Sequence, residues 1–114
     1  PMGVTAAFNK NILAHLNSAF RGDFDLALFE HEAVYNRAER RIEMYLRSVA
    51  RQAVCLRDLD LRITLEAGER IRTELSHKFL PEELRRLAQA AEFLPEREWR
   101  DAEWPFAECL WRAA

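Results

Sequence analysis

The sequence predicts an α+β protein with a mostly antiparallel sheet and two or three helices. Three observations predict it: helical spacing of apolar residues near the start, period-two alternation through the middle, and a helix followed by two short strands at the end. The chain has 114 residues, enough for one substantial hydrophobic core, so we expect a single domain over residues 1–114.

The first helix is expected over residues 4–20. Phe8, Ile12 and Leu16 recur there at helical spacing, and Thr5 is of a type that caps a helix start. Gly22 follows and is typical of the residue type that ends a helix.

A second, short helix is expected after Asp25, which is a plausible N-cap. Phe24 and Phe29 stand on either side of it as a hydrophobic staple does.

Four segments then alternate apolar and polar residues as strands do: residues 41–49, 52–57, 59–66 and 69–79. Residues 67–68 are Ala-Gly, which predicts a hairpin turn between the last two. The pattern indicates an antiparallel meander of four strands.

The end of the chain is expected to hold one more helix and two more strands. Pro81 suits the first turn of a helix over residues 81–93, with an apolar stripe of Leu84, Leu87, Ala88 and Ala91. Strands over residues 95–101 and 104–113 are expected to follow.

Composition excludes several classes of function. Charged residues make up 32% and hydrophobic residues 49% of the chain, with a formal net charge of −2, which is typical of a soluble globular protein. No basic run predicts nucleic-acid binding, and the apolar runs are too short to span a membrane. The three glycines stand far apart, so no glycine-rich phosphate-binding loop is expected.

The cysteines and histidines predict no metal site. Cys55 and Cys109 lie in apolar segments and are interpreted as buried free thiols of a cytoplasmic protein, with a disulfide or redox pair as the alternative. His15, His31 and His77 lack the spacing of metal ligands.

The segment "TELSHKF", residues 73–79, contains a carboxylate and a hydroxyl two residues apart. Strict alternation would put Glu74 and Ser76 on one strand face together with Arg72, and Thr73 on the other. The polar face could be a solvated charge ladder or a pair of groups aimed at a bound molecule. The residues alone leave both interpretations open, and Met44 on an earlier strand is by itself typical of a core.

Three motifs, with the segment that follows the last, occur in order over essentially the whole chain: "GVTAAFNKNIL", "YNRAERRIEMYLRS" and "AGERIRTELSHKF", then "PEELRRL". Together they resemble the C-terminal half of the histidine-specific, S-adenosylmethionine (SAM)-dependent Nα-methyltransferases. Those enzymes trimethylate L-histidine to hercynine, the first step of ergothioneine biosynthesis. The resemblance implies a substrate-binding insert joined to the C-terminal tail of a Rossmann-like methyltransferase.

The resemblance also implies roles for individual residues. Glu74 and Ser76 match the glutamate and serine that bind the substrate imidazole, and Met44 matches a methionine that lines the same pocket. Thr5 and Phe8 are implied to lie near this pocket. No catalytic, SAM-binding or metal-binding residue of the family maps onto this chain, and SAM is expected to bind an N-terminal half outside it.

The expected function is therefore recognition of L-histidine, or of a related amine, by a chain that is inactive alone. One alternative is a stand-alone module that binds a small molecule or dimerises. Another is one half of a split enzyme that pairs with a separate N-terminal half. Neither nucleic acid nor a membrane is an expected partner.

Overall fold

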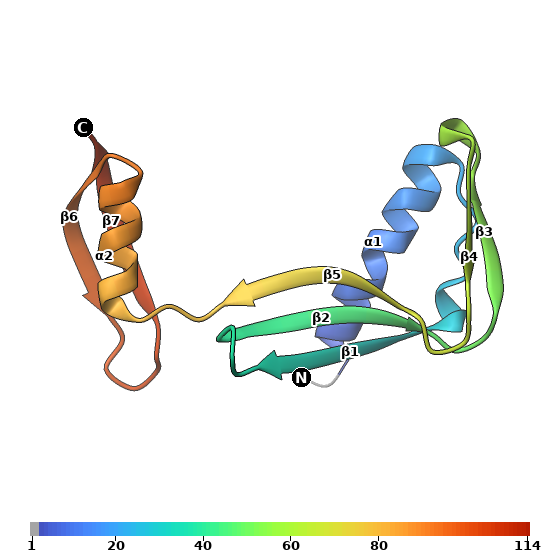
Figure 1. The fold of residues 1–114 in the computed structure, drawn as a ribbon, viewed down its shortest axis with the longest axis horizontal. Coiled ribbons are helices and arrows are strands. Elements are labelled where there is room, and N and C mark those ends of the chain that lie inside the picture. The colour runs from blue at the N-terminus through green and yellow to red at the C-terminus, as the bar shows by residue number, and fades with distance from the viewer. Residues whose placement is uncertain (1–2) are drawn as a thin grey trace. The chain divides into compact units, whose positions relative to one another are not determined.

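The computed structural model describes residues 3–114. They form two compact units, residues up to 77 and residues 78–114, and each unit is described by itself. The strands of residues 3–114 form three small antiparallel sheets, accompanied by two α-helices, so the α+β prediction is confirmed (Figure 1).

The first unit holds most of the regular structure. Its elements are α1 (Val4–Phe20), the 3-10 turn η1 (Leu26–Leu28), β1 (Phe29–Asn36), β2 (Arg41–Ser48), β3 (Gln52–Leu56), the 3-10 turn η2 (Arg57–Leu59), β4 (Leu61–Leu65) and β5 (Arg70–His77). The second unit consists of α2 (Pro81–Ala90), β6 (Phe93–Arg100) and β7 (Ala107–Ala113).

The strands of the first unit do not form the predicted four-stranded meander. One sheet has the order β1-β2-β5, and β3 pairs with β4 in a second sheet. The Ala-Gly turn does exist, with Gly68 at φ +89° and the Glu69 N–H donating to the Glu66 carbonyl at 3.1 Å. The turn leads β5 away from β4 to the edge of β2, where the half-buried Ile71 of β5 pairs with the buried Leu46 of β2 and packs against the core.

The prediction of a short helix after Asp25 is wrong, because only a single 3-10 turn forms there. The Asp25 carboxylate does accept a hydrogen bond from the Ala27 N–H at 3.0 Å, and the Phe24 and Phe29 rings lie 5.9 Å apart. Only η1 forms, however, and the chain continues as β1, a strand that the sequence pattern did not predict. The cap is local, whereas the pairing of β1 with β2 depends on residues far along the chain.

Helix α1 has the predicted bounds, but Thr5 is not its cap. Gly3 occupies the N-cap position at φ +94°, so Thr5 lies inside the first turn. At the other end Arg21, rather than Gly22, adopts the left-handed conformation, with φ +47°. Gly22 is required for another reason: a Cβ atom there would lie 2.6 Å from the Leu56 side chain.

The core of the first unit lies between α1 and one face of the sheet β1-β2-β5, with β3 and β4 at its side. Its buried residues are Leu13, Phe24, Phe29, Leu46, Val54, Leu56 and Leu65. The helix contributes the side that contains Asn9 and Leu13. The predicted packing stripe was therefore partly wrong, because Phe8 is 69% exposed and Ile12 is also exposed.

The second unit has the predicted order of elements, but α2 ends at Ala90 instead of residue 93, β7 begins at Ala107 instead of residue 104, and Leu87 of the predicted apolar stripe is exposed. Pro81 begins α2, and the Glu83 carboxylate accepts a hydrogen bond from the Leu80 N–H at 2.6 Å, which satisfies one amide at the helix start. Ala88 is buried, as expected for the helix stripe, and β6 pairs with β7. Across residues 3–114, neither helix is long and apolar enough to cross a membrane.

Candidate functional site

A β-bulge interrupts the pairing of β2 with β5 within the "TELSHKF" segment. Met44 pairs with Glu74 and Tyr45 pairs with Arg72, so Thr73 is an extra residue on the β5 side. The Thr73 hydroxyl donates to the Asn9 side chain of α1, so Thr73 points toward the helix. A bulge of this kind makes two consecutive residues of one strand oppose a single residue of the other.

The bulge changes which side chains of β5 share a face. Facing residues of an antiparallel pair point to the same side, so Glu74 lies on the face of Met44 and Arg72 on the opposite face, with Tyr45. Strict alternation had put Arg72 and Glu74 together, which is wrong because the extra residue resets the alternation. Glu74 and Ser76 thereby lie on the helix-covered face, as do Leu46 and Ile71 of the core.

Three of the predicted site residues meet in two rows across the three strands. One row is Ala33, Met44 and Glu74, and the next is Tyr35, Ile42 and Ser76. Directly opposed side chains in such rows have Cβ atoms about 4.5–5.5 Å apart. Glu74, Ser76 and Met44 therefore form one patch, which we call the row patch.

The row patch lies where the sheet continues past α1. Figure 1 shows β1, β2 and β5 extending beyond the first turn of the helix. Met44 and Ser76 are half-buried, Glu74 is exposed, and Tyr35 is 52% exposed. The patch is thus an open, partly apolar surface with a carboxylate and a hydroxyl on it.

Thr5 and Phe8 lie on different sides of α1. Asn9 contacts the bulge, and Thr5, four residues earlier, lies on the same side of the helix one turn further toward the row patch. Phe8 is adjacent to Asn9 in sequence and is therefore rotated by about 100° around the helix, and its ring is exposed. Both side chains are solvent-exposed in this chain.

Asn9 is a buried polar residue that the sequence analysis missed. It is 4% exposed, and its amide nitrogen donates to the Tyr45 carbonyl at 3.1 Å and contacts His31 Nδ1 at 2.9 Å. With the Thr73 hydroxyl, the one side chain connects α1 to β1, β2 and β5. The sequence signal that could have revealed Asn9 is its position four residues before Leu13, on the helix side that the core covers.

The opposite face of the same sheet carries the charge ladder that was the alternative interpretation for Glu74. Arg47 pairs with Glu30, and Arg70 pairs with Glu32 at 3.3 Å. The Arg70 guanidinium also lies 4.3 Å from the centre of the Tyr45 ring. The ladder exists, but the bulge puts Glu74 on the other side of the sheet from it.

Glu43 is the most perturbed acid of this ladder face. It is 8% exposed, and its carboxylate accepts hydrogen bonds from the Tyr45 hydroxyl, from Arg41 Nε at 2.7 Å and from Asn36 Nδ2 at 3.2 Å. These donors lower the pKa of Glu43 from 4.5 to about 2, with Tyr45 the largest contributor. The same bond raises the pKa of Tyr45.

Glu43 is therefore expected to make the free energy of unfolding depend on pH in the acid range. Because its pKa is lower in the folded chain, its contribution is fully present above about pH 4.5 and is lost as the pH falls toward 2. Denaturant midpoints measured between pH 6 and 2 should fall more steeply for the wild type than for Glu43→Gln. If the denaturant midpoints of the two proteins fell in parallel with pH, Glu43 would not be the cause of the acid dependence.

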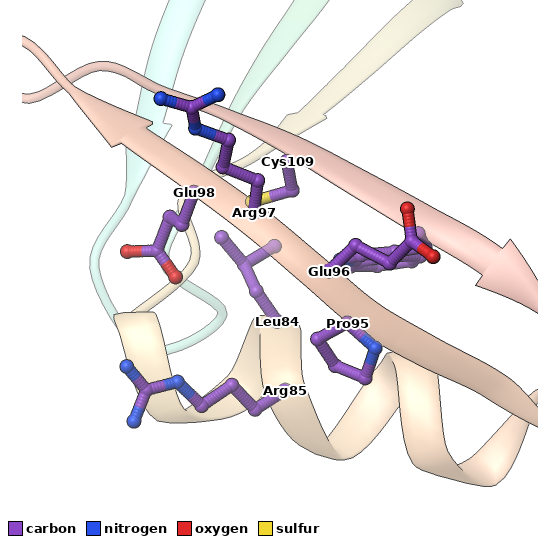
Figure 2. A pocket seen from close by; sticks show the side chains of 8 residues that line it. Leu84, Arg85, Pro95, Glu96, Arg97, Glu98 and Cys109 are labelled. Atoms are coloured by element: carbon purple, nitrogen blue, oxygen red, sulfur yellow. The ribbon is translucent and has the colours of Figure 1, made fainter.

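The second unit has a small cavity of its own, of about 170 Å³, between α2 and the strands β6 and β7 (Figure 2). It is lined by Leu84, Arg85, Pro95, Glu96, Arg97, Glu98, Cys109 and Trp111. Its carboxylates are already paired, Glu96 with Arg112 and Glu98 with Arg100. The predicted site residues all lie in the first unit, and none of them lines this cavity.

Both cysteines are free, as predicted, but neither is buried as predicted. Cys55 and Cys109 are each half-buried. Both lie on strands of two-stranded sheets, which leave one face partly open to solvent.

Comparison with known proteins relates the chain to one enzyme. It is 44% identical over 110 residues to histidine N-alpha-methyltransferase of Mycobacterium tuberculosis. This matched stretch covers 96% of this chain and 34% of the relative. It is 50% identical over 90 residues to histidine N-alpha-methyltransferase of Mycolicibacterium smegmatis, covering 79% of this chain and 27% of the relative. The chain thus spans 27–34% of the length of the curated relatives it matches.

The family comparison covers nearly the whole chain. Residues 1–113 match the family described as histidine-specific, SAM-dependent methyltransferase, which confirms the resemblance carried by the three sequence motifs. The chain belongs to the SAM-dependent, histidine-specific methyltransferase family.

Proposed function

We propose that this chain is the L-histidine-recognition part of a SAM-dependent histidine Nα-methyltransferase that makes hercynine. The observation that carries the proposal is the bulge at Thr73, because it brings Glu74 and Ser76 onto the face that also holds Met44. The family's activity gives this polar pair a ligand with matching groups: an imidazole ring with one N–H donor and one nitrogen acceptor.

Glu74 and Ser76 would read the two ring nitrogens. The Glu74 carboxylate would accept a charge-assisted hydrogen bond from the ring N–H, and the Ser76 hydroxyl would bond to the other nitrogen. Two residues along a strand separate the side-chain bases by about 6–7 Å, a span that longer and shorter side chains can close around a ring. A site that hydrogen-bonds a substrate ring strongly rejects substrates without those groups.

Positioning would be the main contribution of these residues to the reaction. Methyl transfer from a sulfonium requires a neutral amine held in line behind the methyl group. Fixing the imidazole fixes the rest of the histidine molecule relative to that line. Met44 would supply an adaptable apolar wall beside the ring, and Thr5 would lie closer to it than Phe8, because Thr5 shares the helix side of Asn9.

SAM itself does not fit the groups of this chain. Glycines occur only at 3, 22 and 68, and the sheets of the described part are antiparallel, without the strand–glycine loop–helix that holds a nucleotide cofactor. The part of the relatives that this chain does not span would therefore bind SAM, and the isolated chain would be inactive. The part of the relatives that this chain does not span would also cover the exposed row patch. The free thiols suit the cytoplasm, where we place the enzyme.

A chimera tests the proposal. Residues 3–113 replace the matching segment of the Mycobacterium tuberculosis relative, and histidine methylation is measured with SAM as donor. We expect the chimera to methylate histidine and the 114-residue chain alone to methylate nothing. A chimera that folds and binds SAM but leaves histidine unmodified would contradict the recognition role, and light scattering of the chain alone would reveal a dimerising module.

A further inference from the structure

We infer that Asn9 and Thr73 are positioning residues that hold the bulge of β5 and thereby aim Glu74 at the substrate. The inference rests on the proposed function, since it assigns Glu74 to the histidine ring. It adds two residues that touch no substrate and act through the strand.

The register of β2 with β5 shifts between Met44 and Tyr45, and a bulge locally disrupts the regular ladder. Side-chain groups of α1 and β5 lie within hydrogen-bond distance of two β2 carbonyls at this point. Asn9 Nδ2 donates to the Tyr45 carbonyl at 3.1 Å, and the Thr73 hydroxyl lies 3.2 Å from the Met44 carbonyl. These contacts connect the extra residue of β5 with β2 and with α1, so the two side chains favour the bulged register.

The network around Asn9 is complete, which fixes the direction of its amide. The Thr73 hydroxyl donates to Asn9 Oδ1, while Asn9 Nδ2 faces the Tyr45 carbonyl and His31 Nδ1. An amide nitrogen only donates, so His31 Nδ1 is the acceptor in this pair. Asn9 therefore contacts one atom from each strand of the sheet, and two of these contacts, with Tyr45 and Thr73, lie at the bulge.

Loss of the bulge would change the site directly. With all residues retained and the chain anchored at Ile71, a regular ladder would pair Thr73 with Met44. Glu74 would then move to the opposite face, because side chains alternate along a strand. The hydrogen bonds of Asn9 and Thr73 thus favour the register in which Glu74 lies beside Met44.

The test uses Thr73→Val in the complete enzyme, a change that removes the hydroxyl and keeps the branched shape. We expect a rise of roughly tenfold in the KM for histidine, with the affinity for SAM nearly unchanged. Thr73→Ser, which restores the hydroxyl, should return the KM to near the wild-type value. Thr64→Val, on the exposed side of β4, is the matched control and should leave the KM unchanged.

A double mutant separates positioning from simple loss of stability. If Thr73 acts through Glu74, then Thr73→Val should add little to the KM of a Glu74→Gln enzyme. Additive effects, or a parallel fall in SAM affinity and melting temperature, would overturn the inference. Asn9→Leu gives a second route, because it removes the amide that contacts both the Tyr45 carbonyl and the Thr73 hydroxyl.

The outcomes also distinguish this inference from the proposed function. If Glu74→Gln raises the KM for histidine and neither Thr73→Val nor Asn9→Leu does, the positioning role fails and the recognition role stands. If Glu74→Gln also leaves the KM unchanged, the recognition role itself fails, and the positioning role with it.

Discussion

Replacing Glu74 with alanine in the complete enzyme is expected to raise the KM for histidine by roughly ten- to hundredfold. The change removes the proposed charge-assisted hydrogen bond to the ring, and a contact of this kind contributes about 1.5–3 kcal/mol. The affinity for SAM should stay near normal, because Glu74 lies in a patch of Met44 and Ser76 and the chain has no cofactor loop. Steady-state kinetics with histidine varied, and a separate SAM titration, measure the two effects.

Arg72→Ala is the matched control for this experiment. It alters a charged residue two positions from Glu74, but the bulge puts Arg72 on the opposite face, across from Tyr45. Its KM for histidine should therefore stay near that of the wild type. Equal losses of histidine and SAM affinity in Glu74→Ala would refute the assignment of Glu74 to the substrate ring.

Phe29→Ala is expected to give the largest loss of stability, about 3–5 kcal/mol. The Phe29 side chain is 0% exposed, and its ring packs 5.9 Å from the Phe24 ring, so truncation leaves a cavity in the core of the first unit. Urea unfolding followed by circular dichroism measures the change.

Phe8→Ala is the control for the stability experiment, since it removes the same atoms from a ring that is 69% exposed. It should change the free energy of unfolding by less than about 0.5 kcal/mol. Similar losses in the two variants would mean that the Phe29 ring is not part of the core.

The sequence predicted the elements that have a clear local pattern. The strands corresponding to β2, β4 and β5 alternate cleanly, and Pro81 marks the start of α2. β1 was not predicted because three consecutive polar residues, Glu30, His31 and Glu32, interrupt the apolar–polar alternation. The partners of its two glutamates are arginines on other strands, which the local sequence does not reveal. The pairing of β5 with β2 is likewise non-local, and a turn sequence alone cannot reveal it.

The residues of the candidate site, Glu74, Ser76 and Met44, are a prediction from the family motifs. Their arrangement on the sheet was not predicted, because simple alternation put Glu74 on the side of Arg72. No glycine marks the bulge, and the hydrogen bonds that hold it come from Asn9, more than sixty residues away in sequence. On α1, Phe8 and Ile12 form a second apolar stripe beside the buried one, so spacing alone could not tell which stripe faces the core.

The bulge has a consequence for insertions and deletions in this region. Losing one residue between Ile71 and Glu74 would turn the bulge into a regular ladder and still leave Glu74 and Ser76 on the face of Met44. Losing Leu75 would instead move Ser76 to the opposite face, away from Glu74. Homologues can therefore differ in length before Glu74 and keep the pair intact, but between Glu74 and Ser76 the spacing has to stay at one residue.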